Sequence, residues 1–339
     1  MDIKKNIDKT FFDDWTKKMQ TIESESDFLA LCKVAMEFQY QNNKVYRQWC
    51  DSLPYNINNI SSVNDIPFLP ISFYKSFEVT CFKDCEYEDY FLSSGTSSMQ
   101  RSRHFVYNKD FYIQNTFSCF SQFFSNIEDY CFICLLPNYL EQQHSSLICM
   151  MNAFVKKSKY QNSGFYANNL EDVVKVLIDN ENSGINTVLF GVTYALLDLV
   201  ENFPDLRLKN TVVFETGGMK GRREELPKAE IHNILTRSLG IGSIASEYGM
   251  CELFSQAYSL KDGVFFTPKQ MQVIVKEIND YKNILDYGKR GILNIIDLCN
   301  IDTCCFIQTE DVGRKISENS FEIIGRLDHS DIRGCNLMY

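Results

Sequence analysis

From about Tyr90 onward, short apolar and β-branched segments alternate with longer helical segments along the chain. The strands that we expect lie at residues 130–136, 187–190, 210–214 and 242–245. Helices are predicted between them at residues 170–180 and 224–239, and the second places its apolar side chains largely on one side. This alternation predicts an α/β fold, in which helices pack on a sheet.

The start of the chain has a different pattern. Phe28, Leu31 and Ala35 recur at helical spacing, and Ser26-Asp27 is expected to cap that helix. Two prolines at residues 65–73 forbid a regular helix and favour an extended segment. The first part of the chain therefore predicts helices that lead into an extended connection.

The end of the chain is richer in β-type residues. Runs at residues 272–278, 292–298 and 320–324 indicate a smaller β subdomain. The division that we expect is a helical N-terminal preface at residues 1–64, an α/β core at 65–256, and a β-rich subdomain with a terminal cysteine segment at 257–339.

The charge pattern limits the possible partners. The formal charge is −10, and acidic and basic residues are interspersed, whereas a nucleic-acid partner needs clustered Lys and Arg. A small or apolar substrate fits better. No apolar run approaches the roughly 18 residues of a membrane span, and the first residues lack the apolar core of a signal peptide.

The cysteines indicate the compartment. The chain has 13, an odd number, without a repeating spacing, which argues against a disulfide framework or a Cys-x-x-Cys metal site. A reducing cytoplasm is the expected location. Most of the thiols are expected to act as small core hydrophobes.

The segment Ser93-Ser94-Gly95-Thr96-Ser97-Ser98 is a hydroxyl-rich turn around one glycine, followed by Arg101 and Arg103. Backbone N–H groups and hydroxyls in such a loop can surround phosphate oxygens. A solvated Ser/Thr turn explains the same residues. The Walker spacing with its terminal Lys-Ser/Thr is missing, so a P-loop NTPase is not supported.

Two further motifs have the residue types of a nucleotide site. Gly217-Gly218 follows an apolar strand, where a ligand can approach the backbone closely, although a tight strand-to-helix turn is the plain alternative. In Tyr248-Gly249-Met250-Cys251-Glu252, the tyrosine could stack on a purine and Glu252 could hold Mg²⁺. A core tyrosine and a surface glutamate are the alternative for this second motif.

Residues 309–314 and 325–334 each resemble ordinary turns, but the order of all these motifs is informative. It resembles the adenylate-forming superfamily of acyl- and aryl-CoA synthetases, in which Ser-Ser-Gly-Thr, Tyr-Gly-x-x-Glu, Thr-Gly-Asp and Gly-Arg-x-Asp follow one another. Within that superfamily the chain is most similar to the LuxE-type acyl-protein synthetases. The shared segments are Ile66-Pro67-Phe68-Leu69-Pro70, Pro137-Asn138-Tyr139-Leu140-Glu141, Ser145-Ser146-Leu147 and Arg333-Gly334-Cys335, within a likeness that runs from about Phe12 to the terminus.

The resemblance implies a fold and a set of roles. The fold is an adenylate-forming large domain of α/β class with a small β-rich subdomain, lacking the mobile C-terminal domain, because the sequence ends just after the hinge motif at Asp328. Residues 93–98 would cradle the phosphates of ATP and Glu252 would hold Mg²⁺. The base and ribose would be bound by Gly217, Gly218, Tyr248, Gly249, Asp311 and Arg326.

The sequence departs from the superfamily pattern in three ways. The phosphate loop lacks a second glycine and the Pro-Lys of CoA ligases, and Glu310 replaces the glycine that usually precedes Asp311. The catalytic lysine belongs to the missing domain. Lys220, Arg101 or Arg103 are the cations that we expect to replace it.

The chemistry follows from the weakness of a carboxylate as an electrophile. Attack on the α-phosphate of ATP gives a mixed anhydride, with cations stabilising the phosphate charge, and a thiol then takes the acyl group. The resemblance to LuxE-type enzymes implies that this thiol belongs to a cysteine near the C-terminus. It also implies that the acyl group is then passed to a fatty-acid reductase partner. Cys335 matches by position, and Arg333 would favour its thiolate.

The expected substrate is a fatty acid or another apolar acid, of unspecified length, and the predicted enzyme is an AMP-forming acid–thiol ligase. One alternative is a free-standing ligase that acylates CoA or an acyl carrier protein. Another is a non-catalytic nucleotide- or acyl-binding module.

Overall fold

The computed structural model describes residues 9–53, 60–93, 100–136, 144–167, 169–216, 226–278, 280 and 283–327. The chain forms two compact units. Unit 1 comprises Met1–Tyr112, Met250–Ser255 and Phe266–Tyr339, and unit 2 comprises Ile113–Gly249 and Gln256–Phe265. Both units draw on segments far apart in the sequence, and the linear division at residues 64 and 256 stays a prediction.

Unit 2 is built on a parallel sheet in the order β5-β4-β6-β7. Its strands are β4 (Cys131–Leu135), β5 (Gly164–Phe165), β6 (Thr187–Gly191) and β7 (Thr211–Glu215). Every residue of β4 and β6 is buried, as expected where helices cover both faces of a parallel sheet. The three strands predicted first are thus confirmed within one residue at each end.

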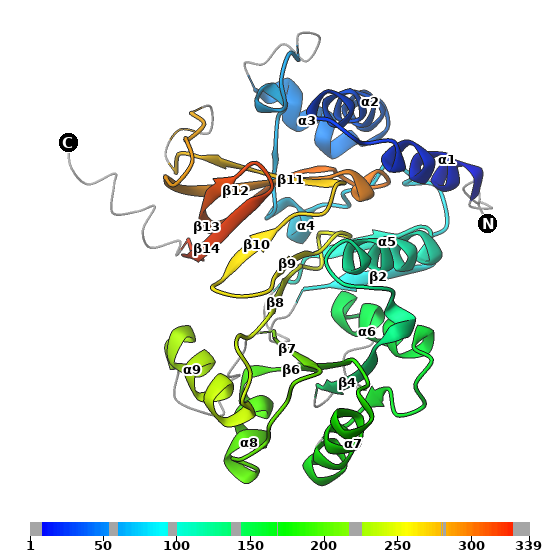
Figure 1. The fold of residues 1–339 in the computed structure, drawn as a ribbon. Coiled ribbons are helices and arrows are strands. Elements are labelled where there is room, and N and C mark those ends of the chain that lie inside the picture. The colour runs from blue at the N-terminus through cyan, green and yellow to red at the C-terminus, as the bar shows by residue number, and fades with distance from the viewer. Residues whose placement is uncertain are drawn as a thin grey trace. The chain divides into compact units, whose positions relative to one another are not determined.

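Four helices flank this sheet: α6 (Ser146–Lys157), α7 (Leu170–Ser183), α8 (Thr193–Asn202) and α9 (Lys228–Leu239). Figure 1 shows α6 on one side of β4 and α7 on the other. The chain moves in one direction along the sheet from β4 to β5 and in the opposite direction from β5 to β6. Because both crossovers are right-handed, the helices α6 and α7 must lie on opposite faces of the sheet. The helix predicted at 170–180 is confirmed, and the described part of the second begins at Lys228.

The strand predicted at 242–245 is wrong. Gly240 ends α9 in the left-handed conformation, and the following residues bend back toward β7. Only Ala245 joins the sheet, through a bridge to Phe214 in which its N–H donates to the Val213 carbonyl. The strand β8 lies just beyond, at Ser246–Tyr248, and pairs antiparallel with β9 (Ala257–Ser259).

The β8–β9 hairpin contains a partly buried carboxyl group. Glu247 is the cross-strand partner of Tyr258. A Cβ atom at Gly249 would overlap the Glu247 Oε1 atom, so the carboxyl group lies directly against the Gly249 backbone. Burial raises the pKa of Glu247 to about 7.

Unit 1 contains an antiparallel sheet in the order β11-β12-β13-β14, and β1 pairs parallel with β13. The strands are β1 (Leu69–Pro70), β11 (Met271–Lys276), β12 (Arg290–Asp297), β13 (Phe306–Ser317) and β14 (Ser320–Arg326). A separate hairpin joins β2 (Asp89–Leu92) to β3 (Arg103–Val106). The short strand β10 (Val264–Phe266) runs across the division between the units.

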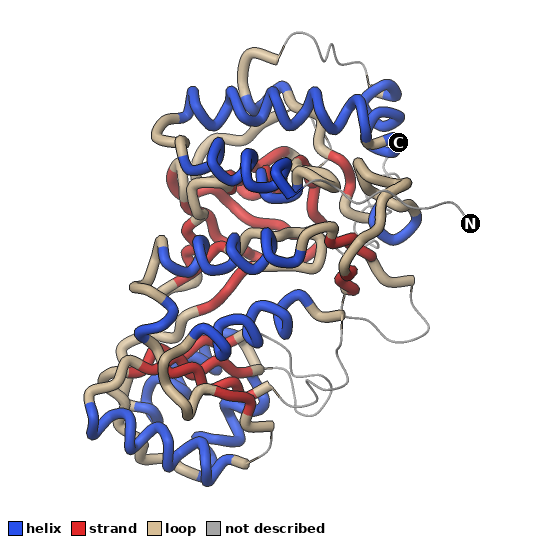
Figure 2. The backbone as a smooth tube through the Cα atoms, turned by 90° about the vertical axis from the view of Figure 1, so that its right-hand side faces the viewer, coloured by secondary structure: helices blue, strands red, loops and turns tan. Residues whose placement is uncertain are grey.

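The helices of unit 1 come mostly from the start of the chain: α1 (Lys9–Gln20), α2 (Glu25–Asn42), α3 (Lys44–Ser52) and α4 (Phe73–Ser76). In Figures 1 and 2, α2 and α3 lie over one face of the β11–β13 sheet. The helix α5 (Lys109–Ser121) continues from unit 1 into unit 2. Short 3₁₀ turns occur at Val63–Asp65, Ile127–Asp129 and Leu298–Asn300.

Two local predictions for unit 1 are wrong. The cap of α2 is Ser24, whose hydroxyl accepts the Asp27 N–H, so the helix begins before the predicted Ser26-Asp27. Residues 309–314 are not a turn but the middle of the 12-residue strand β13. Gly325 and Arg326 likewise end β14.

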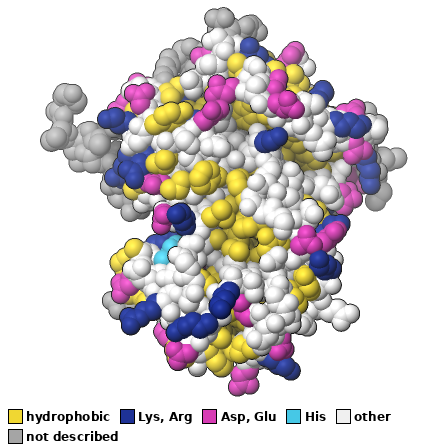
Figure 3. All heavy atoms as spheres, viewed as in Figure 1, with side chains coloured by type: hydrophobic (Ala, Val, Ile, Leu, Met, Phe, Trp, Pro, Cys, Tyr) yellow, Lys and Arg dark blue, Asp and Glu magenta, His cyan; other side chains and the backbone are white. Residues whose placement is uncertain are grey.

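The length and hydropathy of the described helices bear on whether the chain could cross a membrane. Within the described ranges, none of the helices combines the length and hydropathy needed to span a bilayer. On the face drawn in Figure 3, Lys and Arg side chains are interspersed with Asp and Glu.

Gly313 in β13 is required by close packing. A Cβ atom there would overlap the Glu322 carbonyl oxygen and lie 2.8 Å from a Leu293 methyl group, whereas a Cβ at Gly325 meets nothing within 4 Å. We therefore expect Gly313→Ala to lower the free energy of unfolding by at least about 2 kcal/mol. Gly325→Ala, on the same hairpin, should change it by less than about 0.5 kcal/mol. Equal values from denaturant unfolding would contradict the close packing of β13 on β14.

Glu247 should make the stability of the protein depend on pH. The folded protein keeps the Glu247 proton up to about pH 7, whereas the unfolded chain releases it near the ordinary value of 4.5. The free energy of unfolding should therefore fall as pH rises from about 4.5 to 7. Because Glu247 retains some exposure, we expect Glu247→Gln to gain about 1–2 kcal/mol over the parent at pH 8 and nothing at pH 5. Urea unfolding at both pH values tests this, and identical pH profiles would refute it.

Candidate active site

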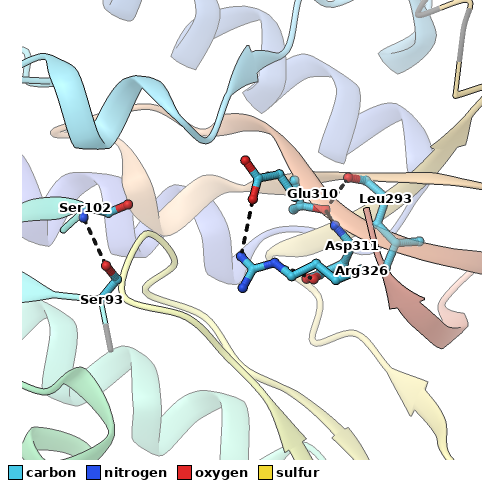
Figure 4. A network of polar contacts seen from close by, with 7 residues as sticks. Ser93, Ser102, Leu293, Glu310, Asp311 and Arg326 are labelled. Atoms are coloured by element: carbon cyan, nitrogen blue, oxygen red, sulfur yellow. Dashed lines mark hydrogen bonds and ion pairs between the residues drawn. The ribbon is translucent and has the colours of Figure 1, made fainter. Parts of the chain in front are cut away.

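The hairpin β2–β3 carries the predicted phosphate loop. The Ser93 N–H donates to the Ser102 carbonyl at 3.1 Å, and the Ser102 N–H donates to Ser93 Oγ at 3.0 Å (Figure 4). These bonds extend the strand pairing beyond Leu92 and Arg103 and close the loop at its base. The other predicted phosphate ligands, Ser94, Gly95, Thr96, Ser97 and Ser98, lie outside the described residues.

The two arginines after the loop are exposed. The Arg103 guanidinium lies over the Phe105 ring, with 5.2 Å between its central carbon and the ring centroid. Arg101 precedes Ser102, at the base of the loop. Both arginines therefore follow the loop directly in the sequence, on either side of Ser102.

Glu252 belongs to the segment Met250–Ser255, which is part of unit 1. Glu252 is only 5% exposed, so it is not the surface residue of the alternative interpretation. Its backbone carbonyl accepts a hydrogen bond from Asn300 Nδ2 at 2.7 Å. The turn that follows β12 therefore binds the backbone of this segment.

Asp297 and Asn300 bind the next residues of this segment. The Phe254 N–H donates to Asp297 Oδ2 at 2.9 Å and to Asn300 Oδ1 at 3.0 Å. The Ser255 N–H and hydroxyl both donate to the Asp297 carboxylate, at 2.8 and 2.6 Å. Burial raises the pKa of Asp297, and these hydrogen bonds oppose that shift by stabilising the charged form.

His104 in β3 connects the phosphate-loop hairpin to the Glu252 segment. Its Nδ1 atom lies 2.8 Å from the Cys251 carbonyl and its Nε2 atom lies 2.8 Å from Thr303 Oγ1. The ring is fully buried and stacks on Phe254, with centroids 4.3 Å apart. Burial lowers the pKa of His104 to about 3, so the ring is neutral. A carbonyl can only accept, so Nδ1 carries the proton and Nε2 accepts from Thr303.

The predicted ribose ligands Asp311 and Arg326 are brought together by the β13–β14 register. They are direct cross-strand partners, and Arg326 Nε lies 3.7 Å from Asp311 Oδ1. Arg326 also lies 3.8 Å from Glu310, and its side chain is 65% exposed (Figure 4). Ion pairs this exposed are weak, so Arg326 can exchange them for a ligand at little cost.

Tyr248 and Gly249 belong to unit 2. Tyr248 is 6% exposed and its ring lies 5.9 Å from that of Phe265, over which the Lys228 ammonium is also placed at 5.9 Å. Gly249 follows at the end of β8 beside the Glu247 carboxyl group. The predicted adenine residues here are thus part of an ordered hairpin.

The carboxyl end of β7 leads to the predicted Gly217-Gly218 turn. Glu215 there is 5% exposed, accepts a hydrogen bond from the Thr193 hydroxyl, and lies 3.7 Å from His232 Nε2. Gly217, Gly218 and Lys220 lie outside the described residues, as do Asp328 and Cys335.

A magnesium ion requires oxygen ligands and usually takes only one or two carboxylates, the rest coming from water and substrate phosphates. Among the described residues there is no cluster of three or more His, Cys, Asp or Glu side chains arranged to hold a metal. If Glu252 is the expected metal ligand, a single carboxylate suits Mg²⁺ that arrives with a nucleotide. It does not suit a dedicated protein-bound metal.

His104, Asp297, Asn300 and Thr303 were not predicted from the sequence. Asp297 interrupts the apolar run Ile295-Ile296 before Leu298, which is a weak signal for a buried carboxylate. Their partners are distant in sequence, and the separation of His104 and Cys251 is 147 positions. Sequence patterns alone do not reveal such pairs.

Comparison with known proteins identifies the fold and a family likeness. The family model described as acyl-protein synthetase, LuxE, matches residues 4–120. A long-chain-fatty-acid–luciferin-component ligase from Vibrio harveyi is 39% identical over 70 residues, which are 21% of this chain and 18% of that protein. The sequence likeness to that relative therefore spans a small part of its length.

Solved structures match much more of the chain. A 2-hydroxyisobutyryl-CoA ligase in complex with its acyl-AMP has a TM-score of 0.66 at 13% identity, covering 91% of this chain and 69% of that one. ATP-bound MatB from Rhodopseudomonas palustris has a TM-score of 0.53 at 12% identity. The match covers 73% of this chain and 50% of the MatB chain. At such identities these likenesses establish the fold. The fold expected from the motif order is confirmed: this chain has the adenylate-forming ligase fold, and its residues 4–120 match the family model of the LuxE acyl-protein synthetases.

Proposed function

We propose that the protein is an AMP-forming acid–thiol ligase, which joins a carboxylic acid to AMP and then transfers the acyl group to a thiol. One observation carries the proposal. In unit 1, the hairpin with the hydroxyl-rich loop is joined through His104 to the segment that bears Glu252. A nucleoside triphosphate that binds with Mg²⁺ requires a phosphate-binding loop and a metal-binding carboxylate that are held close together.

The roles are assigned residue by residue. Ser93 and the loop after it bind the phosphates, and Asp311 and Arg326 bind the ribose hydroxyls from adjacent strands. Tyr248 and Gly249, with Gly217-Gly218, bind the adenine. Glu252 holds Mg²⁺, which neutralises phosphate charge when bound. Lys220, Arg101 or Arg103 supply the further cation that the transfer needs.

The proposed acid is a long-chain fatty acid or a similar apolar acid. Support comes from the Vibrio harveyi relative, whose name gives a long-chain fatty acid as its substrate. The partner that receives the acyl group is then an acyl reductase, and a cytoplasmic location stays a prediction. In the non-catalytic alternative, the same fold would bind a nucleotide or an acyl group without catalysing a reaction.

The proposed acyl acceptor is Cys335. The other twelve cysteines are free thiols, and only Cys85 and Cys149 among them are partly exposed. Burial raises the pKa of Cys50 to about 12, and it also raises the pKa of Cys32 and Cys134. A buried protonated thiol is a poor nucleophile, so the acceptor must be one of the accessible cysteines or Cys335. Release to CoA or a carrier protein is the second candidate.

Glu252→Gln and Asp311→Asn should both suppress acid-dependent ATP–pyrophosphate exchange. We expect a loss of about 100-fold for Glu252→Gln, because it removes the metal-binding charge, and at least tenfold for Asp311→Asn. Glu322→Gln is the matched control, since Glu322 also lies on the β13–β14 hairpin but pairs with Arg314 at 2.7 Å. It should keep exchange within about threefold.

A panel of fatty and aryl acids in the same assay identifies the acid. If no acid supports exchange in the parent protein while ATP still binds, the non-catalytic alternative replaces the ligase. If both carboxylate variants exchange like the parent, the nucleotide-site assignment is wrong.

Cys335→Ser should separate the two half-reactions. The variant should keep pyrophosphate exchange, because adenylation does not use the thiol, and lose the hydroxylamine-labile acyl label that the parent acquires from ATP and acid. The control is the double variant Cys85→Ser/Cys149→Ser, which removes the partly exposed described thiols and should keep the label. Label retained in Cys335→Ser but lost in the control would move the acceptor to Cys85 or Cys149. A parent that is never labelled while CoA is acylated would favour the CoA-ligase candidate.

A further inference from the structure

The backbone of residues 251–255 is bound by buried side chains from two other parts of unit 1. Four groups of this segment are involved: the carbonyls of Cys251 and Glu252 and the N–H groups of Phe254 and Ser255. Their partners are His104, Asn300 and Asp297, each at most 1% exposed. A main chain bound at almost every residue by fully buried groups has little freedom to move.

These partners come from different elements. Asp297 and Asn300 belong to the end of β12 and the turn after it, whereas His104 belongs to β3, two residues after Ser102 at the base of the phosphate loop. The Cys251 thiol adds a weak contact to the Ser102 carbonyl at 3.9 Å. Of these two hydrogen bonds from the phosphate-loop hairpin to the Glu252 segment, that of His104 is the stronger.

We propose that His104 is a positioning residue that fixes Glu252 relative to the phosphate loop, so that the metal and the triphosphate are bound together rather than independently. The inference rests on the proposed nucleotide site and adds a role that the motifs do not contain. The imidazole is fully buried, so its proposed role is indirect. It acts by holding the Cys251 carbonyl, one residue before Glu252, through the Nδ1 proton.

The geometry of His104 supplies a matched pair of variants. The amide nitrogen of Asn reaches about as far as His Nδ1, and that of Gln about as far as Nε2. His104→Asn can therefore still donate to the Cys251 carbonyl, whereas His104→Gln keeps only the Thr303 side. Both lose the stacking on Phe254, so any destabilisation from that loss is shared.

The quantity to measure is the metal dependence of ATP binding, the ratio of the Kd in EDTA to the Kd in saturating Mg²⁺, by calorimetry. The parent should show a ratio well above one, and Glu252→Gln should bring it close to one. His104→Asn should keep the parent's ratio within about threefold, and His104→Gln should lower it about tenfold, because a buried carbonyl is left unpaired. In EDTA, ATP affinity should be similar for both.

A double variant separates positioning from general weakening. In the Glu252→Gln background, His104→Gln should have no further effect on the ratio, since its effect passes through Glu252. Asn180→Ala is the control for loss of a buried amide hydrogen bond, here to Thr187 in unit 2, and should leave the ratio unchanged. If His104→Gln does not fold, His104→Ala, which also removes the Nδ1 donor, carries the test and should lower the ratio by a similar factor. Thr303→Val, which removes only the Nε2 partner, should keep the ratio of the parent.

The outcomes distinguish this inference from the proposed function. If the parent binds ATP with no metal dependence, both the Mg²⁺ role of Glu252 and the positioning role of His104 are overturned. If the parent shows the dependence and His104→Gln keeps it, the nucleotide site stands and the positioning role is wrong. Equal losses in His104→Asn and His104→Gln would also overturn it, because they would indicate a stacking effect.

Discussion

The fully buried carboxylate of Asp297 is the interaction on which unit 1 depends most. It accepts hydrogen bonds from the Phe254 and Ser255 N–H groups, the Ser255 hydroxyl and the Cys299 N–H. A buried carboxylate is tolerated only when its lone pairs are satisfied, so these donors cannot move apart without a cost of several kcal/mol. The end of β12, the turn after it and the segment that carries Glu252 are thereby fixed as one element. Glu252, which is 5% exposed, lies within this element.

Side chains from the N-terminal helices also bind the turn that follows β12. Trp15 Nε1 donates to the Leu298 carbonyl at 2.7 Å, Gln39 Nε2 to the Asn300 carbonyl at 2.9 Å, and Asn43 Nδ2 to the Thr303 carbonyl at 2.8 Å. Each donor lies within residues 4–120, the range matched by the LuxE family model. The segment that the family model matches is thus hydrogen-bonded to a turn more than 250 residues away, with separations of 283, 261 and 260 residues. The N-terminal side chains thus donate to the backbone carbonyls of the turn. The side chains of Asp297 and Asn300 form hydrogen bonds with the segment that carries Glu252.

Sequence patterns predicted the elements whose signal is local and missed those whose cause is distant. Strands β4, β6 and β7 are apolar runs because parallel strands are buried on both faces, and their positions were readable. Strand β13 was missed because its Thr, Asp and Gly residues are typical of a turn, whereas Gly313 is there to let Glu322 and Leu293 approach. The motif order predicted that Asp311 and Arg326 act together, which their cross-strand register permits. The pairing of His104 with Cys251 depends on the fold and was not readable.

The same burial that fixes Glu252 also bears on how the proposed reaction avoids a wrong acceptor. Cys251 precedes Glu252 directly, and a reactive thiolate there would intercept the mixed anhydride as it forms. Burial raises the pKa of Cys251 far above its ordinary range, and the neighbouring Glu252 raises it further. The thiol is 7% exposed and hydrogen-bonded to the Ser102 carbonyl. It therefore stays protonated and acts as a packing group. In the proposed reaction, the cysteine next to the proposed metal ligand Glu252 would therefore not compete for the acyl group, which would be left for a thiol outside this buried network.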